Sequence, residues 1–156
     1  MTHINNLESA LKQLYFGGNW TGTNVKDSIQ DINLLMATKQ IEGFNTIAKL
    51  VFHINYYVEG ILPVFDGGIL EIRDKFSFDA PQFNSEEDWN NFKLKVLKNA
   101  ELLIEKVNAL DDDILHQPFV DEKYGNYYRN LNGIIEHTHY HLGQIVILKK
   151  FIQNNV

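Results

Sequence analysis

Four long segments of the chain repeat apolar residues at the spacing of an α-helix, and none of the connections between them shows the regular alternation typical of a sheet. The third segment carries the strongest pattern, with apolar residues at intervals of three and four from Trp89 to Leu110. The segments cover residues 2–15, 45–62, 85–110 and 133–152. Helices of these lengths in one chain of 156 residues predict an all-α fold, an antiparallel four-helix bundle.

Local signals mark the ends of these helices. Thr2 is a predicted N-cap for the first, and either Asn45 or Thr46 suits the second. Ser85 opens the third with a capping signature and acidic residues in the first turn, where the helix dipole favours them. Residues 25–32 predict a short helical turn, and the long connection over residues 63–84 is typical of a functional lid or a packed covering.

Length and composition narrow the function classes. A chain of 156 residues predicts a single domain, 1–156, and the absence of cysteine excludes disulfides, thiolate ligands and a cysteine nucleophile. A net charge of −6, with acidic residues spread along the chain, argues against nucleic acid and anionic lipid as partners. Without a signal-peptide pattern or a run approaching about 20 apolar residues, the expected location is the cytoplasm.

The predicted last helix contains three histidines within five residues, His137-Thr-His-Tyr-His141. On a helix, the outer two lie one turn apart on the same face, and His139 lies near the opposite side. That face also carries Ile134, Ile145, Leu148 and Ile152. The two imidazoles are therefore predicted to face the core.

Two explanations of this pair remain open from spacing alone. Each imidazole can be a core side chain that hydrogen-bonds a neighbour, or both can bind one divalent cation. A metal site needs a further ligand, and His53, within the second helical segment, is the natural candidate. Because the chain lacks cysteine, nitrogen and oxygen must hold the ion; zinc or nickel is expected, with iron or manganese as alternatives.

Three other positions bear on this site. Gln144 returns to the histidine face, within reach of a supporting role beside a ligand or a bound water, although a partly exposed amide is an equal alternative. Tyr57, one turn after His53, lines the entrance or packs in the core. His139 belongs to a second apolar stripe that packs under another helix or forms a homodimer interface. The stripe also contains Ile135, Leu142 and Val146.

Several familiar catalytic motifs are missing from the sequence. The zincin motif His-Glu-x-x-His needs a glutamate directly after the first histidine, where this chain has Thr138, and Glu136 reads as a solvated charge. No Ser-His-Asp arrangement, phosphate loop or dinucleotide fingerprint occurs either. The histidines therefore remain the main candidates for chemistry.

The run from Gly133 to Ile145, with a His-x-x-x-His pair followed by Gly-Gln-Ile, resembles the C-terminal signature of the DinB/YfiT-like proteins. Three further runs resemble that family in order and spacing, so the similarity covers essentially the full length. They are Asn19-Trp20-Thr-Gly22, Ile47-Ala-Lys-Leu50-Val-Phe-His53-Ile and Glu86-Glu-Asp-Trp89.

This resemblance implies a four-helix bundle with a divalent-metal site made by three histidines, which here are His53, His137 and His141. The family's best-understood members are metal-dependent transferases that join small thiols such as bacillithiol, mycothiol or glutathione to electrophiles, and related sequences include isomerases and hydrolases. An arginine often follows the family's third histidine. Leu142 stands there in this chain, so a role that needs a cation at that position does not carry over.

The expected function is therefore that of a metal-dependent transferase which activates a small thiol for attack on an electrophile. Two alternatives use the same three histidines: a hydrolase that activates water, and a non-catalytic protein that binds a metal or a small molecule. The expected partner is a small-molecule substrate, and no residue other than the three ligands is assigned a catalytic role.

Overall fold

The computed structural model describes residues 2–154, and every regular element in that range is helical. Four α-helices are long and two are short. In chain order the α-helices are α1 (His3–Phe16), α2 (Val25–Ile29), α3 (Leu34–Thr38), α4 (Ile47–Ile61), α5 (Glu86–Asn108) and α6 (Tyr127–Asn154). Single 3₁₀ turns lie between them at η1 (Leu62–Asp66), η2 (Asp74–Phe76), η3 (Asp112–His116) and η4 (Glu122–Tyr124). The all-α prediction is confirmed for the described residues.

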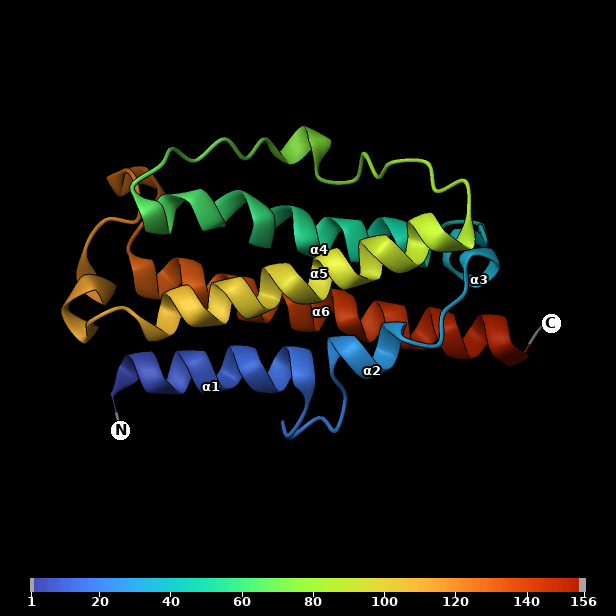
Figure 1. Ribbon diagram of the computed structural model, residues 1–156, viewed down its shortest axis with the longest axis horizontal. Coiled ribbons are helices and arrows are strands. Elements are labelled where there is room, and N and C mark those ends of the chain that lie inside the picture. The colour runs from blue at the N-terminus through green and yellow to red at the C-terminus, as the bar shows by residue number, and fades with distance from the viewer. Residues whose placement is uncertain (1, 155–156) are drawn as a thin grey trace.

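The four long helices lie side by side, with α1 against α5 and α6, and α4 against the same two helices (Figure 1). The pairs α1–α5 and α4–α6 run antiparallel. In contrast, α4 and α5 run in the same direction, because the chain crosses back along α4 before α5 begins (Figure 1). We call the residues of this return, 62–85, the crossover. The sequence predicted an antiparallel bundle. The α1–α5 and α4–α6 pairs agree with that prediction, and the parallel α4–α5 pair does not.

Three of the four predicted helix starts are confirmed by their capping hydrogen bonds. The hydroxyl groups of Thr2, Thr46 and Ser85 accept from backbone N–H groups in the first turns of α1, α4 and α5. At Ser85 the arrangement is a full capping box, since Asp88 bonds back to the Ser85 backbone. These bonds satisfy N–H groups that a helix start leaves without intrahelical partners.

The last helix differs most from its prediction, since α6 begins at Tyr127 rather than near residue 133. The side chain of Asn126 accepts from the Arg129 N–H at 2.9 Å, which is an N-cap bond, and Leu131 is already fully buried. Six additional residues, among them Arg129, therefore lie on the same rigid helix as the histidine pair.

A single apolar core fills the space between the long helices, and buried aliphatic side chains from all four contribute to it. Trp89 and Lys93 of α5 reach from this core to the turn after α2, where both donate to the Ile32 carbonyl, at 2.7 Å and 3.0 Å. Within residues 2–154, none of the helices has the length and apolarity needed to span a bilayer.

Candidate metal centre

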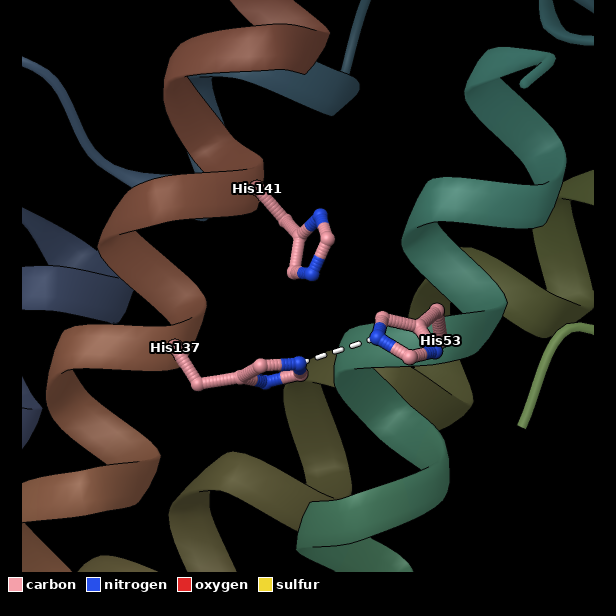
Figure 2. Close-up of side chains that lie close together, drawn as sticks. All are labelled: His53, His137 and His141. Carbon is pink, nitrogen blue, oxygen red and sulfur yellow. Dashed lines mark hydrogen bonds between the residues drawn. The ribbon is translucent and has the colours of Figure 1, made fainter. Parts of the chain in front are cut away.

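Three histidines meet where α4 packs against α6 (Figure 2). His53 comes from α4, and His137 and His141 come from successive turns of α6. One nitrogen from each ring lies within 4.8 Å of those of the other two, and the Nε2 atoms of His53 and His137 are 2.9 Å apart. His53 and His141 are only 5% and 8% exposed. Side chains 84 residues apart in the chain thus converge on one point.

The crossover holds His53 in place. The Nδ1–H of His53 donates to the Ser77 carbonyl at 3.0 Å, and Phe78 stacks on the imidazole with ring centroids 3.7 Å apart and planes 9° apart. A carbonyl oxygen can only accept, so the proton of the neutral ring must sit on Nδ1. The Nε2 atom therefore presents its lone pair to the other two histidines.

Gln144 does the same for His141. Its side-chain oxygen Oε1 accepts from Nδ1 of His141 at 2.7 Å, one turn further along α6. The bond leaves Nε2 of His141 as the basic nitrogen. Partners of this kind are what metal-binding histidines use to fix the tautomer and the orientation of the ring.

The third imidazole lacks such a partner. Nδ1 of His137 is buried and has no hydrogen-bond partner among the described residues, so the ring is held by the 2.9 Å hydrogen bond between its Nε2 and that of His53 and by packing. Tyr57 lies edge-on against it with ring centroids 4.9 Å apart, and edge-on against His53 at 5.2 Å. His137 is therefore the one ring of the three whose Nδ1 no oxygen acceptor holds.

Burial favours the neutral form of two of these rings, His137 and His53. It lowers the pKa of His137 to about 4, and the positive charges that His141 and His53 would carry act in the same direction. Burial also lowers the pKa of His53, although the Ser77 carbonyl favours its charged form. Neutral imidazole is the form that binds a metal ion.

The donor set suits a divalent transition metal. A tetrahedral site with metal–nitrogen bonds of about 2.0–2.1 Å needs nitrogens about 3.4 Å apart, and separations from 2.9 Å up to 4.8 Å bracket that value. Two of the rings have their Nδ1–H groups held by oxygen acceptors. The three histidines could therefore hold a metal ion, and borderline nitrogen ligands do not by themselves select which.

A pocket of about 650 Å³ opens beside the centre, and His137 and Tyr57 form part of its wall. The Tyr57 hydroxyl donates to Oδ1 of Asp74 at 3.1 Å, and burial raises the pKa of that hydroxyl. Asp74, an exposed residue of the crossover, lines the same pocket. A carboxylate thus lies next to a ring that contacts two of the histidines.

The structure places the predicted residues as follows. His53, His137 and His141 come together, and Gln144 contacts His141. Tyr57 contacts His53 and His137 and lines the pocket. His139 is half-buried and is not part of the cluster. Glu136 is exposed and accepts from Asn132 on its own helix.

Sequence reasoning missed the residues that loops bring to the site. Ser77, Phe78 and Asp74 belong to the crossover, and Lys123 and Arg129 reach the pocket from the segment around η4 and the start of α6. The one available signal was the length of the connection before α5, which suggested a covering segment.

Comparisons with protein-family models, with curated proteins and with solved structures each gave no match.

Proposed function

We propose that this chain is a DinB-like four-helix-bundle enzyme that binds one divalent transition metal through His53, His137 and His141 and joins a small thiol to an electrophile. The observation that carries the proposal is the set of three buried or half-buried imidazoles, two of which have their Nδ1–H groups held by oxygen acceptors. The resemblance of the His-x-x-x-His and Gly-Gln-Ile run to the DinB/YfiT-like signature supports the family assignment.

The arrangement of the centre favours chemistry over a purely structural ion. The three histidines of this cluster all come from helices, and the adjoining pocket reaches His137. Catalytic sites commonly combine three protein ligands with an open position. A divalent cation held by three neutral imidazoles keeps its full charge and would act as a Lewis acid toward a thiol or a water molecule.

We assign the role of proton acceptor to Asp74, because its carboxylate lines the same pocket as His137. In the proposed reaction the S–H bond breaks, the proton passes to the Asp74 carboxylate, and the sulfur forms a bond to the electrophilic carbon while the leaving group departs with its electron pair. Tyr57 orients that carboxylate through its 3.1 Å hydrogen bond.

The first experiment tests the metal centre. We expect protein purified without a histidine tag to contain close to one equivalent of metal by mass spectrometry, and His141→Ala to lose it. His139→Ala is the matched control, since His139 lies two residues away on the same helix but outside the cluster. An absence of stoichiometric metal, or equal metal content in His141→Ala and wild type, would refute the site.

The second experiment tests the reaction. Metal-loaded protein should consume monochlorobimane only when a thiol such as cysteine is added, and Asp74→Asn should slow this turnover about 100-fold or more, in the range typical of general-base loss. Metal content should remain that of the wild type. Thiol-independent release of chloride would instead indicate a hydrolase, and metal binding without either activity would indicate a binding protein.

A further inference from the structure

The pocket beside His137 has two chemically different ends. Its wall is mostly apolar and is built from the end of α4, the crossover, the η4 segment and the first half of α6. Tyr57 contacts His137 and bonds to Asp74, which places these three together. Lys123 and Arg129 line the pocket from η4 and the first turn of α6, two turns before His137. The apolar part of the wall consists of Ile61, Leu70, Ile72, Phe119 and Ile134.

The two cations differ in their partners. Lys123 forms an ion pair with Asp121 at 3.4 Å, and its ammonium lies 4.8 Å from the centre of the Tyr124 ring. Arg129 has no carboxylate within ion-pair distance in the described part of the chain. Asp74, the carboxylate that lines the pocket, is bonded to Tyr57. Arg129 thus lines the pocket without an ion-pair partner among the described residues.

The backbone makes room for this side chain. Gly125 has a φ of +78°, and a Cβ built there would lie 2.8 Å from Cδ of Arg129. The stem of Arg129 therefore lies across the glycine, in space that any other residue would occupy. This contact lays the side chain along the start of α6, where Arg129 lines the pocket.

The spacing sets the length of a ligand that reaches both ends. Arg129 precedes His137 by eight residues on α6, about 12 Å along the helix axis. The Arg129 side chain lies over Gly125, toward the start of α6, so it does not shorten that separation. The fitting ligand has its anionic group several bonds away from its reacting atom, with an apolar segment between them. A planar guanidinium binds carboxylate in a two-bond geometry that a lysine does not offer.

We propose that the pocket selects substrates that carry a carboxylate, which Arg129 binds while the thiol at the other end of the molecule reaches the three histidines. This inference rests on the proposed function and specifies its substrate class. It assigns Arg129 a role in recognition and none in the chemical step.

The test uses cobalt-loaded protein and a matched pair of thiols, 6-mercaptohexanoate and 6-mercaptohexanol. Binding is followed by the sulfur-to-cobalt absorption band, so that no turnover is required. We expect the carboxylate to bind at least tenfold more tightly than the alcohol. In Arg129→Gln that preference should disappear, with unchanged affinity for cobalt and for the alcohol. Arg73→Gln, which alters the chain's other arginine outside the pocket, should behave as the wild type.

Three results would overturn this proposal alone. Equal affinity of the wild type for both thiols, or a preference that survives in Arg129→Gln, would show that Arg129 does not bind the carboxylate. A parallel loss of both thiols in Arg129→Gln would show that it only supports the pocket. Failure of the wild type to bind cobalt or either thiol would overturn the proposed function as well, and so is distinguishable from the first three.

Discussion

The two antiparallel helix pairs are filled differently. The buried side chains of α1 are apolar apart from the Tyr15 hydroxyl, and fully buried Val96, Ala100, Leu103 and Val107 run along α5. Between α4 and α6, the core instead contains His53 and His141, with His137 half-buried beside them. The α1–α5 pair is mainly apolar, because the buried Lys93 and Asn99 of α5 bond to the turn after α2 and to Asn55 of α4. The α4–α6 pair instead gathers three imidazoles at one point.

This difference shows what a buried polar cluster requires. Buried apolar side chains need only to fit the space between the helices. Each buried imidazole nitrogen also needs a partner, because leaving it without one destabilises the folded protein. The Ser77 carbonyl and the Gln144 amide supply two such partners, and Nδ1 of His137 is left without one. The crossover, which packs on the histidine side of the molecule, is therefore part of the site.

The largest effect is expected on the free energy of unfolding, from a substitution in the α1–α5 pair. Leu103 is fully buried on α5, so Leu103→Ala should lower the free energy of unfolding by about 2–5 kcal/mol, through lost transfer energy and the cavity that remains. Metal affinity of the folded protein should stay the same. Urea denaturation followed by circular dichroism, together with a metal titration, measures both quantities.

Leu94 provides the matched control for that substitution. It lies on the same helix but is 64% exposed, and Leu94→Ala should change the unfolding free energy by less than about 0.5 kcal/mol. A Leu103→Ala protein that unfolds as the wild type does, or that folds but loses metal, would contradict the division between the two helix pairs.

The second largest effect is expected in the α4–α6 pair, which carries the histidines. Gln144→Ala removes the acceptor for Nδ1–H of His141 and should reduce metal affinity about 10–100-fold, equivalent to about 1.4–2.7 kcal/mol. Gln144→Glu should retain the affinity, since a carboxylate accepts the same bond. Competition with a metal-binding dye measures these values.

Gln153 is the control residue, an exposed glutamine further along the same helix. Gln153→Ala should bind metal as the wild type does. If Gln144→Ala kept full affinity, the 2.7 Å contact would have no bearing on how His141 binds the ion.

The helices were predictable because their signals are local. The Ser85 capping box and the apolar spacing after it lie within the segment that they define, and the His137–His141 pair follows from the helical repeat alone. The start of α6 was missed because Asn126, its cap, follows an irregular stretch in which nothing marks the boundary.

The loop contributions to the site were not predictable in the same way. The bond from His53 to the Ser77 carbonyl joins residues 24 positions apart and involves a backbone group, which no residue type at position 77 reveals. Arg129 reaches the pocket because α6 begins early and because Gly125 leaves space for its stem. Such contacts depend on the path of the backbone, and only the folded chain shows them.

The smallest expected effect is on the pH dependence of stability, and it measures how strictly the core around α1 excludes a charge. Tyr15 is fully buried, and burial raises its pKa to about 12 from 10.0, with the Thr138 hydroxyl acting in the opposite direction. Between these values the unfolded chain loses the phenolic proton while the folded protein keeps it, so stability must fall as pH rises. From pH 8 to pH 11 the loss from this group should be about 1.4 kcal/mol.

Tyr15→Phe should lack that component in urea denaturation at the two pH values, whereas Tyr128→Phe, which alters a tyrosine 47% exposed, should retain it. An identical pH dependence in wild type and Tyr15→Phe would mean that the core around α1 also tolerates a charge. The contrast between the α1–α5 and α4–α6 pairs would then weaken.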